Sequence, residues 1–133
     1  MILNRAAILA ANDLKTEKIP VPEWGGDGAE VLITEISAAQ RDECGRAYIE
    51  LKDAPQIEQV NAFRNRLLVF ALVGEDRQPL FTLEQVHELL AKNGEVIDRI
   101  AAAALKLNKM EPKAAESEAK PSGTDPSAGS SSD

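Results

Sequence analysis

The sequence predicts an α+β fold that is mostly helical, with an N-terminal β-hairpin packed on about four helices. Two short segments rich in β-branched residues lie near the N-terminus, and a glycine-containing loop joins them. After residue 37, apolar residues recur at the three- and four-residue spacing of helices, and polar caps or Gly and Pro breaks separate the stretches. We therefore expect one globular domain over residues 1–109.

The N-terminal part of the chain carries the expected hairpin. A short helix is expected in the first dozen residues, because apolar residues recur there at helical spacing until about Asn12. The two strands are expected at 16–21 and 29–36, joined across the loop 22–28. Pro20 lacks a backbone donor and confines the first strand to a sheet edge. Two strands alone are marginal, so the hairpin must pack on helices or on another chain.

Two long helices are expected after the hairpin. Ser37 and Gln40 match a capping box that opens a helix reaching about Lys52. Residues 53–55 break it, and the next helix is expected over 56–73. This second helix has the widest apolar face of the chain, so we expect it to be the most buried one. That face comprises Val60, Phe63, Leu67, Leu68, Val69, Phe70, Ala71 and Leu72.

The stretch 69–90 predicts helix, turn and helix. Gly74 is expected to end the first helix in a left-handed conformation, which carries no steric penalty for glycine. Thr82 and Gln85 match a second capping box, and Val86 begins the apolar stripe of the helix that follows. A break at 92–94 precedes the last helix, whose inward stripe is expected to be Ile97, Ile100, Ala101, Ala104 and Leu107.

Composition distinguishes the tail from the domain and limits the partners. From about Met110 onward the chain has no Leu, Ile, Val or aromatic residue, so we expect residues 110–133 to be disordered.

The net charge of −7 argues against a nucleic-acid partner. The single Cys44 excludes an internal disulfide and favours a cytoplasmic setting, and the apolar N-terminus is too short to span a membrane.

The sequence lacks a recognisable catalytic or metal-binding pattern. Cys44 and His87 have no signature spacing for a nucleophile and its base, and a zinc site needs more Cys or His residues than these two. Counting an EF-hand loop from Asp76 places Phe81 where that loop requires Gly. We therefore expect no enzyme activity, no cofactor, and no catalytic or metal-ligating residues.

Trp24 is the most informative single residue. Its first interpretation is a loop side chain that fills the domain's own core, and its second is an anchor for a partner, because Trp is enriched at binding hot spots. The first interpretation is the favoured one.

Four blocks in this order resemble the tail assembly chaperones of long-tailed bacteriophages and prophages. They are LAANDLKTEKIPVPEWGG, VLITEISAAQRDE, FRNRLLVFALVGEDRQPLFTLEQVHELL and VIDRIAAAALKLN. The most specific pieces are VPEWG at 21–25, the helix entry at 36–42 and the turn at 75–81. None of these pieces is catalytic, and the resemblance covers about the first 109 residues.

The resemblance implies a chaperone that binds the tape measure protein, a long helical chain, and keeps it soluble in the host bacterial cytoplasm while the tail tube polymerises. The chaperone would then be absent from the finished virion. Family members are commonly also made in a longer form by ribosomal frameshifting, whose extension recruits the tail tube protein. Residues after 110 lie where such an extension would begin. Because the chain ends in Gly, Ser and Asp and not in a folded extension, it resembles the short form. The alternative function is a small tail-completion or connector protein of the particle itself.

For partner binding, we expect an apolar groove between the 56–73 helix and its neighbours, with Trp24 near one edge, in a single chain or a homo-oligomer. The expected partner-binding residues are Trp24, Phe63, Leu67, Phe70, Phe81 and Val86.

Overall fold

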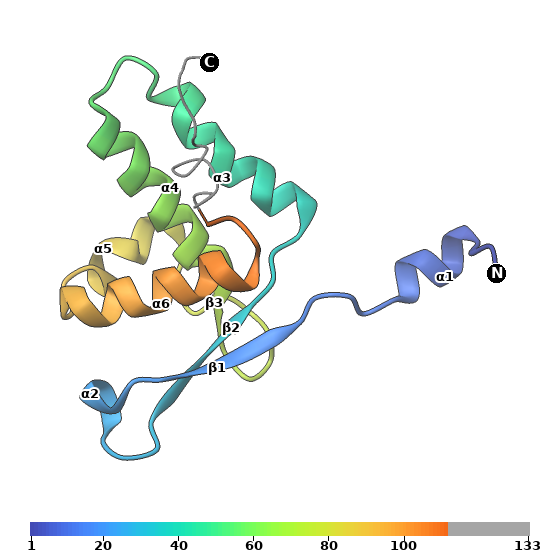
Figure 1. The fold of residues 1–133 in the computed structure, drawn as a ribbon, viewed down its shortest axis with the longest axis horizontal. Helices are drawn as coiled ribbons and strands as arrows, with labels where there is room; N and C mark the ends of the chain where they lie inside the picture. The colour runs from blue at the N-terminus through green and yellow to red at the C-terminus, as the bar shows by residue number, and fades with distance from the viewer. Residues whose placement is uncertain (112–133) are drawn as a thin grey trace, which may run out of the picture.

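The computed structural model describes residues 1–111 and confirms a mostly helical α+β architecture (Figure 1). The strands are β1 (Thr16–Pro20), β2 (Glu30–Thr34) and β3 (Leu72–Val73). The helices are α1 (Arg5–Ala10), α2 (Pro22–Gly25), α3 (Ala38–Glu50), α4 (Gln56–Ala71), α5 (Val86–Leu89) and α6 (Gly94–Leu107), with a 3₁₀ turn, η1, at Leu83–Gln85. The disorder expected for 110–133 falls mainly on residues 112–133, which lie outside the described part.

The expected hairpin is present, and its first strand lies at the sheet edge. Strands β1 and β2 pair antiparallel, with Ile19 opposite Val31 and Pro20 opposite Glu30. The loop between them contains the single turn α2, followed by Gly26 and Gly28 with φ of 84° and 85°. The loop needs glycine at these two positions because other residues rarely adopt such positive φ values.

The expectation that the second long helix continues to residue 73 is wrong. Leu72 and Val73 leave the helix and form β3, paired antiparallel with Ile33 and Leu32 of β2. The sheet therefore has three strands in the order β1-β2-β3. Pairing with the free edge of β2 outweighs the helical pattern, because it satisfies backbone groups that burial would otherwise leave without a partner.

The turn after β3 also differs from the expectation. Gly74 does not adopt a left-handed conformation; in this turn it is Arg77 that does, with φ of 67°. Gly74 N donates to Gln78 O at 3.0 Å, and Leu80 N donates to Leu72 O at 3.2 Å, so the chain folds back on β3. The stretch is helix, strand, turn and helix, not helix, turn and helix.

Both predicted capping boxes are confirmed. Ser37 Oγ accepts from Gln40 N at 3.2 Å, and Gln40 Oε1 accepts from Ser37 N at 3.0 Å. Thr82 and Gln85 make the same reciprocal pair at 3.2 Å each. The second box opens η1, which passes directly into α5.

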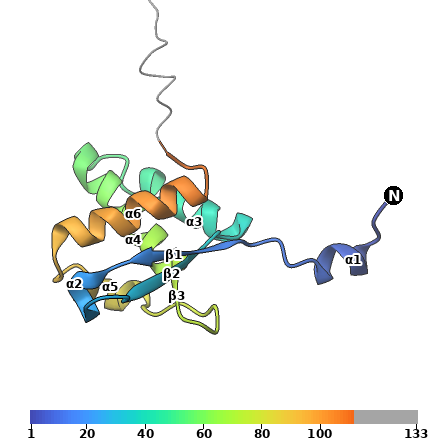
Figure 2. The same cartoon turned by 60° about the horizontal axis from the view of Figure 1, so that its bottom comes forward.

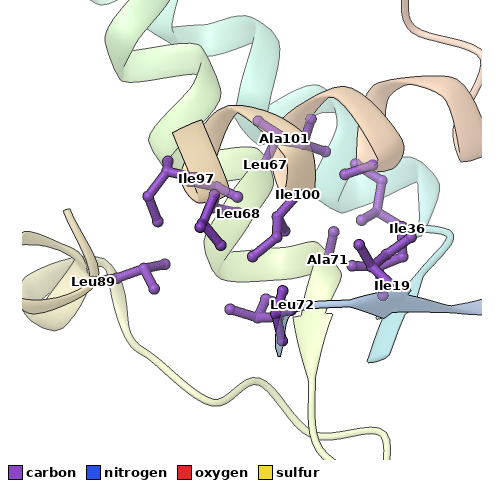
Figure 3. Packing of buried hydrophobic residues seen from close by; sticks show 14 of the residues in the cluster. Ile19, Ile36, Leu67, Leu68, Ala71, Leu72, Leu89, Ile97, Ile100 and Ala101 are labelled. Carbon is purple, nitrogen blue, oxygen red and sulfur yellow. The ribbon is translucent and has the colours of Figure 1, made fainter. Parts of the chain in front are cut away.

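The core lies between the sheet and helices α4 and α6, with α3 packed on α4 (Figures 1 and 2). Figure 3 shows Leu67, Leu68 and Ala71 of α4 meeting Ile97, Ile100 and Ala101 of α6 above Ile19 and Leu72 of the sheet. Contrary to the expectation, α6 is more buried than α4: five of its 14 residues are buried, against four of 16. The N-terminal half of α4 extends beyond the sheet and keeps Val60 42% exposed.

Asn108 fastens the end of α6 to the start of α3. Its side chain is buried: Oδ1 accepts from Ile36 N at 2.7 Å, and Nδ2 donates to Ala104 O at 2.9 Å. Arg41 Nη2 donates to the Asn108 carbonyl oxygen at 2.8 Å. These bonds hold α3 and α6 in fixed relative positions, which shapes the surface between them and α4.

Candidate partner-binding surfaces

An apolar hollow of about 380 Å³ lies between α3, α4 and α6, and we call it the helical groove. Leu67 is fully buried at its floor. The rings of Tyr48 on α3 and Phe63 on α4 lie 5.6 Å apart between their centroids and inclined at 47°, a favourable aromatic geometry. The residues that line the groove are Tyr48, Val60, Phe63, Arg64, Leu67, Ala101, Leu105 and Met110.

The groove is open to solvent on the α3–α4 side. Tyr48 is 41% exposed and Val60 42% exposed, and Ile57, one turn before Val60 on α4, is 64% exposed. Apolar side chains that remain exposed together at a hollow mark an interaction surface more often than scattered ones do. An amphipathic helix could bury its apolar face here.

An ion pair joins α3 and α4, two of the helices that form the groove. Arg66 Nη2 donates to Glu50 Oε1 at 2.5 Å, and Arg66 Nη1 donates to the Glu43 carbonyl oxygen at 2.9 Å, so α4 is tied to α3. The Arg66 guanidinium holds the pKa of Glu50 below its usual value. Among the described lining residues Arg64 alone carries a charge, and its Nε and Nη2 donate to Asn65 Oδ1.

A second hollow, of about 460 Å³, lies beside α2 and the sheet, and we call it the Trp24 hollow. Trp24 is half-buried and packs against the core, while Arg99 of α6 holds the neighbouring Glu23. The lining residues are Trp24, Val31, Leu72, Leu80, Phe81, Glu88, Leu89 and Lys92. Glu88 and Lys92 make this hollow more polar at its rim than the helical groove.

The structure distributes the six predicted partner-binding residues over different places. Phe63 and Leu67 belong to the helical groove, and Trp24 and Phe81 to the Trp24 hollow. Phe70 lines a third, more polar hollow beside Thr34 and Glu35. Val86 is buried, with 8% of its surface exposed.

The predicted partner-binding residues did not include six of the residues that line the helical groove: Tyr48, Val60, Arg64, Ala101, Leu105 and Met110. Leu105 offered a signal, because it lies outside the inward stripe of α6 and yet is apolar. The sequence contains no such signal for Tyr48 and Met110, because their presence in one groove depends on how α3, α4 and α6 pack together.

Within the described residues 1–111, neither hollow is lined by a Ser, Cys or His side chain. Burial raises the pKa of the Cys44 thiol to about 11, so this side chain stays protonated at neutral pH. His87 Nδ1 lies 3.0 Å from the Glu84 carbonyl oxygen on the surface. Within residues 1–111, His, Cys, Asp and Glu side chains form no group able to hold a metal ion. In the same range, helices long and apolar enough to cross a membrane do not occur.

Comparison with known proteins adds a family and a fold. A family model described as phage tail assembly chaperone matches residues 3–121. The chain is similar to the solved structure of the bacteriophage HK97 tail assembly chaperone, with a TM-score of 0.50 and 22% sequence identity over 75% of this chain and 88% of that one. At this identity the likeness concerns the fold. None of the curated proteins compared matches this sequence.

Proposed function

Because this chain belongs to the phage tail assembly chaperone family, we propose that it binds the tape measure protein through the helical groove. In this role it keeps that long helical chain soluble in the host bacterial cytoplasm while tail tube subunits polymerise around it, and it is absent from the finished virion. The observation that carries the proposal is the open apolar groove between α3, α4 and α6 on a family scaffold described as a chaperone.

The groove has the chemistry that an amphipathic helix needs. Apart from Arg64, its lining residues are apolar or aromatic, and Leu67 is buried beneath them, so an inserted apolar side chain loses contact with water on most sides. Burial of one Leu or Ile contributes roughly 1.5–3 kcal/mol. The formal charge of −7 keeps the complex soluble, because copies of an acidic protein repel one another.

The first test is co-expression with the tape measure protein of the same phage or prophage. The full chain is expected to move that protein from the insoluble to the soluble fraction. Val60→Asp places a charge on the groove wall and should abolish the effect. Leu83→Asp is the matched control, because Leu83 is 50% exposed and lines neither hollow. Tape measure solubility that is unchanged by the wild-type chain would refute the proposal.

Departure from the assembled tail is tested by mass spectrometry of purified virions. Peptides of this chain are expected to be missing from particles that contain the tape measure protein. Their presence in stoichiometric amount would instead favour the tail-completion or connector role.

A further inference from the structure

Arg64 brings a single positive charge to the described lining of the helical groove. It lies on α4, which contacts both α3 and α6 (Figure 1). Arg64 is half-buried, and the other described residues that line the groove are apolar or aromatic. A segment that covers this surface removes water from the guanidinium, which is costly unless the segment supplies an acceptor in its place.

The Arg64 guanidinium keeps part of its donor capacity for a partner. Its Nε and Nη2 donate to Asn65 Oδ1 at 3.2 and 3.0 Å, so both bonds end on one neutral amide oxygen. By contrast, Arg46, Arg66 and Arg99 each pair with a glutamate. Among residues 1–111, the structure gives the Nη1 group of Arg64 no acceptor and its charge no carboxylate. A carboxylate is the acceptor that fits the fork of a guanidinium best.

The position of Arg64 on α4 sets the spacing that a bound helix needs. Val60 and Leu67 lie one turn before and one turn after Arg64 on the same face of α4, and all three line the groove. Side chains one turn apart are separated by about 5–6 Å in any α-helix. A helix lying along α4 therefore meets these three residues with side chains that are three or four positions apart in its own sequence.

Charge distinguishes between the segments that have this spacing. A Lys or Arg placed against Arg64 is repelled at contact, even though the acidic protein attracts basic segments at long range. An apolar side chain at that place leaves the guanidinium without water and without a counter-charge. An Asp or Glu side chain avoids both costs. The apolar residues of the groove thus supply affinity, and Arg64 supplies selection.

We propose that Arg64 selects the segment that the helical groove binds. That segment is an amphipathic helix with an Asp or Glu flanked on both sides, at three or four positions, by apolar residues. The acidic side chain pairs with the Arg64 guanidinium, and the flanking side chains pack toward Val60 and Leu67. The inference rests on the proposed function, since it names the kind of tape measure segment that the groove accepts.

The test measures binding of the full chain to overlapping peptides that span the tape measure protein of the same phage or prophage. Circular dichroism confirms that each variant is folded. Peptides that bind the wild type should contain the acidic residue with its two flanking apolar residues. Replacement of that acid by Gln in a bound peptide should weaken binding about tenfold, because it removes a hydrogen-bonded charge pair.

Two changes at Arg64 separate its charge from its packing. Arg64→Gln should bind the acidic peptide and its Gln form equally. Arg64→Glu should reverse the preference, so that a peptide with Lys in place of the acid binds it better than the acidic peptide does. Arg46→Glu is the matched control, because it makes the same change of charge at an exposed residue of α3 that lines neither hollow. It should keep the wild-type order of the peptides.

The outcomes separate this inference from the proposed function. Equal binding of the acidic, Gln and Lys peptides by the wild type would overturn the inference and leave the proposed function intact. Tighter binding of acidic peptides by Arg64→Glu would mean that an acidic segment of the chain itself occupies the groove, and the inference would be wrong. If the wild type bound none of the tape measure peptides, the proposed function and the inference would both fail.

Discussion

Arg99 of α6 binds the carboxylate of Glu23 on α2 with two hydrogen bonds, from Nη1 to Oε1 at 2.9 Å and from Nη2 to Oε2 at 2.6 Å. Arg99 Nη1 also donates to the Pro20 carbonyl oxygen at 3.1 Å. The Arg99 guanidinium thus joins α6 to the end of β1 and to α2. Its contact on α2, Glu23, directly precedes Trp24 in the sequence. This contact joins two residues that are 76 positions apart in the sequence, and one of them is the neighbour of Trp24.

The Glu23–Arg99 pair predicts a pH dependence of stability. The hydrogen bond from Arg99 lowers the pKa of Glu23 from 4.5 to about 2. Because the pKa of Glu23 is lower in the folded state than in the unfolded state, the Glu23–Arg99 pair stabilises the fold fully above the unfolded-state pKa. This stabilisation is lost as the pH falls toward 2. The difference in unfolding free energy between the wild type and Glu23→Gln should therefore be largest above about pH 5 and shrink below it.

Urea unfolding followed by Trp24 fluorescence across that pH range measures the difference. High salt should reduce it, because both partners are partly exposed. A Glu23→Gln variant that differs from the wild type by the same amount at every pH would contradict the assignment.

Asn108→Ala should destabilise the fold by about 1–3 kcal/mol, because it leaves the buried Ile36 N–H without its acceptor. Asn65→Ala is the matched control: its side chain bonds only the neighbouring Arg64 among described residues, and it should change stability by less than about 0.5 kcal/mol. Equal effects of the two changes in urea unfolding would show that Asn108 does not connect α6 to α3 as described.

Two glycines should respond to alanine in opposite directions. A Cβ at Gly45, inside α3, would meet nothing within 4 Å, so Gly45→Ala should stabilise the protein by roughly 0.5–1 kcal/mol. Gly28 also has open space but a φ of +85°, so Gly28→Ala should destabilise it by about 1–2 kcal/mol. Thermal or urea unfolding measures both, and a stabilising Gly28→Ala would contradict the loop conformation.

Features set by neighbouring residues could be predicted from the sequence. Ser37 with Gln40, and Thr82 with Gln85, identify helix starts because each cap is complete within four residues. Pro20 indicates an edge strand because a missing N–H is a property of the residue itself.

Features that depend on distant pairing could not be predicted. Leu72 and Val73 continue a helical apolar pattern, and only the free edge of β2 makes them a strand. The helical groove collects Tyr48, Phe63 and Leu105 from three helices, so its lining follows from their packing. The apolar pattern of α1 was visible, but its separation from the core was not.

The central claim is that the helical groove binds the tape measure protein, and the dissociation constant for purified tape measure segments tests it most directly. Val60→Asp should weaken binding at least tenfold, equivalent to about 1.4 kcal/mol, because the partner would bury an aspartate against apolar walls. Leu83→Asp should leave the constant within about twofold of the wild-type value. Equal affinities of the wild type and a correctly folded Val60→Asp variant would contradict the account.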